Sequence, residues 1–160
     1  MLGIEKPVLE RELEEAMVRE IRKVLLELGY GFAFIGNQYR LQADGNDYFI
    51  DLLFSHRKLN CLVAIELKIG KFMPEYAGKM NFYLNLLDDL IKEKHENPSI
   101  GIILCTERDN FTVEYALRGL NKPVGVSEYT HTLPDELTQK LPDPKLLEEK
   151  LRLSLPKEGS

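Results

Sequence analysis

Three charged residues stand in otherwise apolar segments, and together they could form a metal-dependent catalytic centre: Asp51, Glu66 and Lys68. Asp51 interrupts the apolar segment 48–54. A buried ionised acid is costly unless it is paired or binds a metal. Glu66 and Lys68 stand two residues apart at the end of the apolar segment 61–68, and in a β-strand this spacing puts both side chains on one face. The pattern therefore predicts two carboxylates and one amine that converge from neighbouring strands.

Two carboxylates beside an amine suit the hydrolysis of a phosphodiester bond. Mg²⁺ prefers oxygen ligands and keeps several waters, which leaves coordination positions for a substrate phosphate. We expect Asp51 and Glu66 to hold this ion together with the backbone carbonyl of Leu67, and Mn²⁺ to be able to substitute for it. A bound ion would stabilise charge on the phosphate and lower the pKa of a bound water. Lys68 would hold or help to deprotonate that water.

Each of these residues also has a structural interpretation. Asp51 could be an acid that accepts hydrogen bonds from backbone amides, and Glu66 with Lys68 could be a surface ion pair at a strand end. An acid two residues before a lysine is a weak motif alone. The combination is stronger, because both segments are apolar except at these residues.

The elements that would position these residues follow from periodicity and turn residues. Apolar residues at helical spacing predict a helix over 9–28, which Gly29 would terminate. Asp44-Gly45-Asn46 predicts a hairpin turn. Strands are predicted over 32–41, 48–54, 61–68, 100–105 and 124–128, with further helices over 74–91 and 111–120. This order predicts an α/β sandwich whose central mixed sheet is flanked by helices and whose last strands are parallel.

The composition fits one soluble domain and excludes few functions. The chain has 160 residues, 44% of them hydrophobic and 29% charged, and no apolar run approaches the roughly 20 residues of a membrane span. We expect a cytoplasmic protein without membrane contact, in which Cys61 and Cys105 are buried reduced thiols. The net charge of −5 argues mildly against a nucleic-acid partner, although the segment 57–79 is locally basic.

Several linked segments resemble the C-terminal nuclease domain of the bacterial YhcG family, once called DUF1016. They are FAFIG at 32–36, IDLLF at 50–54, IELK at 65–68, PEY at 74–76 and IILC at 102–105. The resemblance runs from about Leu13 to Tyr129 and implies the PD-(D/E)XK nuclease superfamily, with its restriction-endonuclease-like α/β sandwich. It implies a metal-dependent DNA endonuclease, acting on branched or foreign DNA, in which Asp51, Glu66 and Lys68 form the catalytic centre that binds Mg²⁺.

The resemblance also indicates accessory positions. Glu14 resembles the acid that the superfamily often adds from the first helix, although a solvated helix face explains it equally well. The family commonly has Gln where this chain has Lys79, and an Arg near Gln38 where this chain has Asn37, so Gln38 and Lys79 are possible accessory residues of the site. Substrate contacts are therefore expected to differ, with Lys79 as a phosphate contact. Tyr83 could face the site or occupy the core. Likewise, Phe72 could stack on a base or pack inside.

We expect residues 1–130 to form the nuclease-like domain and residues 131–160 a charged, proline-containing tail with a helix. DNA is the expected partner, and a homo-oligomer, an N-terminal targeting domain or a separate partner are compatible with the sequence. The competing hypothesis is a DNA-binding or protein-assembly module that keeps the nuclease fold without cutting. A hydrolase of small phosphoesters is a third, which would need a closed pocket.

Overall fold

The structure is a computed structural model that describes residues 2–129 and 141–154, with side chains over 11–129 and 141–153. Its elements follow the predicted order. They are α1 (Leu2–Glu27), β1 (Phe32–Ala43), β2 (Asn46–His56), β3 (Cys61–Leu67), α2 (Pro74–Leu90), β4 (Ile100–Cys105), α3 (Asn110–Leu117), β5 (Val124–Glu128) and α4 (Pro144–Ser154).

The described strands form one mixed sheet in the order β1-β2-β3-β4-β5. The pairs β1–β2 and β2–β3 are antiparallel, whereas β3–β4 and β4–β5 are parallel. Each parallel pair is joined by a helix, α2 in the first case and α3 in the second, as crossover connections require. The predicted mixed sheet with parallel last strands is confirmed.

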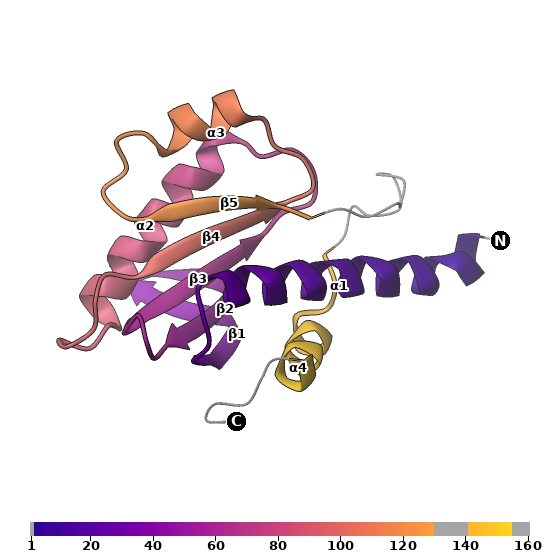
Figure 1. Ribbon diagram of the computed structural model, residues 1–160, viewed down its shortest axis with the longest axis horizontal. Helices are drawn as coiled ribbons and strands as arrows, with labels where there is room; N and C mark the ends of the chain where they lie inside the picture. The colour runs from indigo at the N-terminus through magenta and orange to yellow at the C-terminus, as the bar shows by residue number, and fades with distance from the viewer. Residues whose placement is uncertain (1, 130–140, 155–160) are drawn as a thin grey trace.

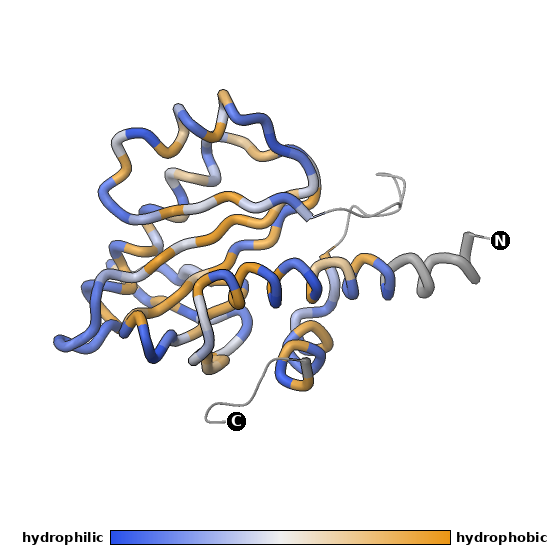
Figure 2. Tube along the Cα trace, in the orientation of Figure 1, coloured by the Kyte–Doolittle hydropathy of each residue, from blue (hydrophilic) through white to orange (hydrophobic). Residues whose placement is uncertain are grey.

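Helices cover both faces of this sheet (Figure 1). One hydrophobic cluster joins α1 and α4 to residues of β2, β3 and β4, and a second joins α2 and α3 to the opposite face of the same strands. Every residue of β3 is buried, which explains why its sequence is apolar on both alternating faces. Hydrophobic residues accordingly concentrate along the central strands (Figure 2).

The hairpin β1–β2 is longer than predicted, because pairing continues up to its turn. Ala43 pairs with Asn46, so the loop is the two residues Asp44 and Gly45, both with positive φ (51° and 76°). This is the geometry of a type I′ turn, for which Asp-Gly is a preferred sequence. Because β3 pairs only with Leu52–His56, the tip of the hairpin extends beyond β3 as a two-stranded arm.

Other boundaries differ at helix ends. α1 begins at Leu2 rather than at residue 9, and α3 ends at Leu117 rather than at residue 120. Asp109 caps the start of α3, because its side chain accepts a hydrogen bond from the Thr112 N–H. That cap fixes the start of α3 next to the loop that follows β4.

The C-terminal segment contributes a helix to the first cluster. Leu147 and Leu151 of α4 are buried against α1 and β1, and Asn37 Nδ2 donates to Glu148 Oε1 at 2.8 Å. The remainder of the predicted tail, residues 131–140 and 155–160, lies outside the described residues.

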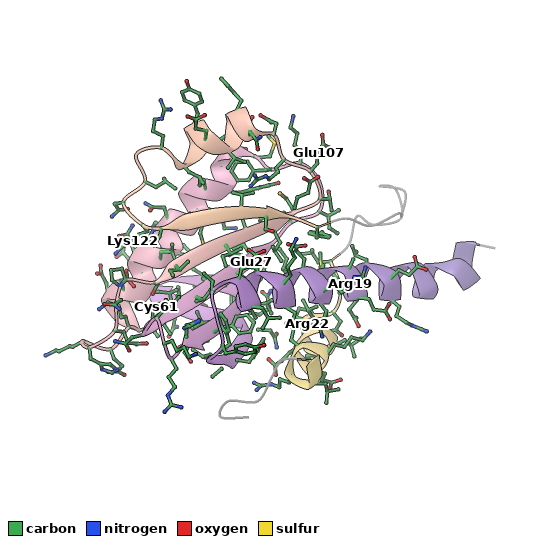
Figure 3. The ribbon with its side chains drawn as sticks, viewed as in Figure 1. Arg19, Arg22, Glu27, Cys61, Glu107 and Lys122 are labelled. Carbon is green, nitrogen blue, oxygen red and sulfur yellow. The ribbon has the colours of Figure 1, made fainter. Side chains whose placement is uncertain are left out.

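The two ends of the sheet can be told apart in Figure 3. Cys61, which begins β3, and Lys122, which precedes β5, lie at one end, and Glu107, which follows β4, lies at the other. Asp51 and Glu66 lie toward the second end, where β3 finishes.

Candidate active site

The carboxyl groups of Asp51 and Glu66 meet across β2 and β3. The antiparallel register pairs Leu52 with Ile65, and one further step in each direction sets Asp51 opposite Glu66. The two carboxyl groups are close enough to share a hydrogen bond. Asp51 is half-buried and Glu66 is 7% exposed, so the acid pair is only partly accessible to solvent.

The surroundings of Glu66 disfavour its charged form. Burial raises its pKa to about 9, with further contributions from the hydrogen bond to Asp51 and from the Asp51 charge, while Lys68 and Lys79 act in the opposite direction. Two acids in contact at a buried position are stable together either as a pair that shares a proton or with a cation between them. The donor set therefore fits a divalent cation.

Few side chains near Asp51 and Glu66 could serve as further metal ligands. Among the described residues, no group of three or more carboxylate, imidazole or thiol side chains is arranged to hold a metal. A cation at Asp51 and Glu66 would take its remaining ligands from backbone oxygen, water and substrate, which is the habit of Mg²⁺. The Leu67 carbonyl remains the proposed backbone ligand.

Both carboxylate oxygens of Asp51 are oriented by hydrogen bonds. The Leu67 N–H donates to Asp51 Oδ2 at 2.8 Å, and Gln38 Nε2 donates to Asp51 Oδ1 at 2.9 Å. Gln38 reaches this position because the pairing of β1 with β2 shifts between Phe34 and Gly36, as in a β-bulge. After this shift, Gln38 lies opposite Asp51, with φ of 46° in the left-handed region.

Two lysines approach the acid pair from one side of the sheet. Lys68 Nζ lies 4.7 Å from the Tyr76 ring centroid, and Lys79 Nζ lies 5.5 Å from that of Tyr83. Both lysine charges act on Glu66, so the structure brings Lys68 and Lys79 to the acid pair. Tyr83 is 5% exposed and packs in the second cluster, which confirms the core interpretation, although it borders the site. Burial raises the pKa of Tyr83, and Lys79 partly offsets that effect.

The backbone that carries Lys68 is held by a residue that the sequence analysis did not identify. The hydroxyl of Tyr129, just after β5, donates to the Lys68 carbonyl at 2.9 Å, and the Lys68 N–H donates to the Leu104 carbonyl at 2.8 Å. Tyr129 is 1% exposed. No local pattern marks it, because its partner lies far away in the sequence.

Glu14 does not join this group. Its carboxylate forms an ion pair with Lys150 of α4 at 2.5 Å, and its neighbours Leu13 and Met17 pack in the first cluster, on the face of the sheet opposite α2. The interpretation as a third acid of the site therefore lacks support. The helical spacing that buries Leu13 and Met17 also buries Glu14 beside the α4 lysine.

The two cysteines are free and buried, as predicted. Burial raises the pKa of Cys105 to about 11 and also raises that of Cys61. A protonated buried thiol is a poor nucleophile and a poor metal ligand.

Comparison with known proteins assigns the chain to a family. The family model described as "YhcG PDDEXK nuclease domain" matches residues 1–146. The chain belongs to this YhcG nuclease-domain family. It is a nuclease domain of the PD-(D/E)XK type. A relative in Escherichia coli (strain K12), named "Putative nuclease YhcG", is 46% identical over 127 residues, which cover 79% of this chain. The chain spans 34% of that relative's length.

Solved structures share the fold. A repair endonuclease from Pyrococcus abyssi matches with a TM-score of 0.50 at 15% identity, covering 73% of this chain and 46% of that protein. EndoMS in a complex with double-stranded DNA matches with the same TM-score and identity, covering 74% of this chain and 45% of that protein. The expected restriction-endonuclease-like α/β sandwich is thus confirmed. No helix among the described residues is long and apolar enough to cross a membrane.

Proposed function

We propose that this domain hydrolyses phosphodiester bonds in DNA with a divalent metal ion held by Asp51, Glu66 and the Leu67 carbonyl. The observation that carries the proposal is the pair of touching carboxyl groups with two lysines beside it, on one face of the sheet. Mg²⁺ fits this oxygen donor set, and Mn²⁺ is the expected substitute. When bound, such an ion stabilises negative charge on the phosphate and provides an acidic bound water.

The chain's own residues position the reactants. Gln38 and the Leu67 N–H fix the rotation of the Asp51 carboxylate. Lys68, half-buried beside Glu66, holds the attacking water, helps to remove its proton and favours the developing negative charge. Lys79, exposed on α2, contacts a substrate phosphate.

DNA is the proposed substrate for two reasons. The segment 57–79 carries five basic residues, Arg57, Lys58, Lys68, Lys71 and Lys79, against the acids Glu66 and Glu75, which gives it a local positive charge despite the net charge of −5. The structures that share the fold include a repair endonuclease and a DNA complex of EndoMS. We propose branched or foreign DNA as the physiological substrate.

A second candidate is a domain that binds DNA or a protein partner without cutting. The acidic net charge favours its protein-binding form, because binding to DNA phosphates relies on basic side chains. The chain spans 34% of the length of its Escherichia coli relative. Both candidate functions are therefore compatible with an additional N-terminal targeting domain, a separate partner or a homo-oligomer.

The test is incubation of the purified protein with linear, nicked and branched DNA in the presence of Mg²⁺, Mn²⁺ or EDTA. We expect cutting with either metal and none with EDTA. Binding without cutting on every DNA and with every metal would favour the second candidate, and cutting in EDTA would contradict the metal-dependent mechanism.

A further inference from the structure

Three aromatic rings form a cluster that reaches the acid pair through Tyr83: Tyr48 of β2 with Phe82 and Tyr83 of α2. The centroid of the Phe82 ring lies 5.1 Å from that of Tyr48 and 6.2 Å from that of Tyr83. Tyr48 and Tyr83 are 6.4 Å apart, so the three rings form one cluster. Tyr83 is buried, whereas Phe82 keeps 45% of its surface exposed.

This cluster is joined to the acid pair and to Lys79 through Tyr83. Along α2, Lys79 stands one helical turn before Phe82 and Tyr83, and residues three or four apart are neighbours on a helix surface. The charges of Lys79, Glu66 and Asp51 all act on the Tyr83 hydroxyl. Phe82 is therefore the exposed aromatic surface next to the proposed phosphate contact.

Packing accounts for only part of this arrangement. Tyr48 meets the Phe82 ring at an interplanar angle of 65°, in an edge contact that leaves much of Phe82 uncovered. Phe72, the other aromatic residue considered for base stacking, is 1% exposed and packs in the core. Proteins that bind single strands use an exposed aromatic face beside a cationic groove to stack a base. Inside a duplex both faces of a base are covered by its neighbours, so a surface ring can stack only on an unpaired base.

We propose that Phe82 stacks on an unpaired base next to the scissile phosphate, so that the domain selects DNA with a single-stranded nucleotide at the cutting position. This inference rests on the proposed DNA-cutting function and names its substrate class. Tyr48 supports the Phe82 ring, and Lys79 contacts the phosphate beside that base.

The test is a double-mutant cycle between the ring and the base. A duplex with a single-stranded arm is cut by wild type, and the base is then removed at one position after another around the cut. We expect the loss of one base to lower kcat/KM by about tenfold in wild type. The same loss should have no further effect in Phe82→Leu, because that variant has no ring to stack on. Phe82→Tyr, which keeps the ring, should behave as wild type.

A matched control removes an exposed ring elsewhere. Tyr30 is 63% exposed between α1 and β1, at the end of the sheet where Phe32 pairs with His56, away from Asp51. Tyr30→Leu should keep the full dependence on the base. The melting temperature of each variant identifies any loss of packing against Tyr48.

The outcomes separate the two proposals. Equal sensitivity to base removal in wild type and Phe82→Leu, at every position, would overturn the stacking proposal while the cutting activity stands. Efficient cutting of fully paired DNA without preference for the arm would overturn it as well. Absence of cutting by wild type on any DNA would instead refute the function on which the proposal rests.

Discussion

At the scale of single residues, the acid pair was predictable, Gln38 was indicated only as a possible accessory residue, and Tyr129 was not identified. Asp51 and Glu66 stand out because each breaks an apolar strand, and a charge in such a place needs a partner. Gln38 lies in a predicted strand. Its contact with Asp51 depends on a shift in the pairing of β1 with β2, which no turn residue predicts. Tyr129 bonds to a carbonyl 61 residues earlier in the chain, which no local pattern can reveal.

We propose that Gln38 positions Asp51, since it donates a hydrogen bond to that carboxylate although its backbone adopts a left-handed conformation that favours glycine. We expect Gln38→Gly to relieve backbone strain and keep or raise the melting temperature. Loss of the hydrogen bond to a carboxylate, typically about 1.5–3 kcal/mol, should lower kcat by roughly tenfold or more and raise the Mg²⁺ concentration for half-maximal cutting. The KM for DNA should not change.

The matched variant is Gln38→Asn, which tolerates the same backbone conformation and keeps a shorter amide. Wild-type kcat and wild-type metal dependence in Gln38→Gly would show that Asp51 needs no such support.

At the scale of elements, periodicity and turn signals located every strand, and β4 and β5 agree with their predicted bounds. The contacts between elements were harder to predict from the sequence. A methyl group on Gly101 of β4 would lie 2.5 Å from Met80 Cγ, so α2 approaches β4 closely at this glycine. The sequence contains Gly101 but not the helix residue that faces it.

Asp88, a buried acid near the end of α2, bonds to residues of two later segments. Asp88 Oδ1 accepts hydrogen bonds from the N–H and the hydroxyl of Ser99, and Asp88 Oδ2 pairs with Lys122 Nζ at 2.6 Å. Burial alone would raise the pKa of Asp88, but the hydrogen bonds from Lys122 and Ser99 outweigh it, and the pKa lies below its usual 3.8. Ionised Asp88 therefore joins α2 to β4 and to the segment before β5.

A lowered pKa makes this stabilisation depend on pH. It is fully present above the unfolded pKa of 3.8 and is lost as pH falls through the lower folded value. We expect Asp88→Asn to destabilise the domain by about 1–3 kcal/mol at pH 7, and the gap to wild type to narrow below about pH 4. Urea unfolding at pH 7 and below about pH 4 measures this difference in the free energy of unfolding. The control is Asp89→Asn, which changes the exposed neighbouring acid. A gap that is constant with pH would contradict the ionic role of Asp88.

At the scale of the whole molecule, two helical layers enclose the sheet, and α4 belongs to one of them. The sequence indicated a charged helix near the C-terminus but not its place against α1 and β1. Its charges contribute to that placement, since Lys150 pairs with Glu14, and the Arg152 guanidinium lies 4.8 Å from the Phe34 ring centroid. We propose that α4 is a structural part of the domain, beyond the expected boundary at residue 130.

Leu151 and Leu153 of α4 provide a matched test of this proposal. Leu151 is fully buried, whereas Leu153 is 88% exposed. We expect Leu151→Ala to lower the free energy of unfolding by about 2–5 kcal/mol, because it leaves a cavity in the first cluster. Leu153→Ala should change it by less than about 0.5 kcal/mol. Equal, small effects of both substitutions in denaturant unfolding would show that α4 is dispensable.

The central claim is that Asp51 and Glu66 hold a metal ion that cuts DNA, and Glu66→Gln tests it most directly. The substitution keeps the shape of the side chain and removes one anionic ligand, and an amide is a poorer ligand for a hard cation. Each roughly 1.4 kcal/mol of lost transition-state stabilisation is about tenfold in rate, so loss of the metal should slow cutting by orders of magnitude.

The measurement is the rate of DNA cutting in Mg²⁺ by wild type, Glu66→Gln and the exposed control Glu12→Gln, together with calorimetric Mg²⁺ binding and melting temperatures. The account predicts that Glu66→Gln loses cutting and binds Mg²⁺ more weakly. It also predicts a melting temperature without metal that is equal or higher, because burial already favours the uncharged form of Glu66 and the amide keeps that form's shape and its ability to donate to Asp51. Glu12→Gln should match wild type throughout. Wild-type cutting by Glu66→Gln would contradict the claim.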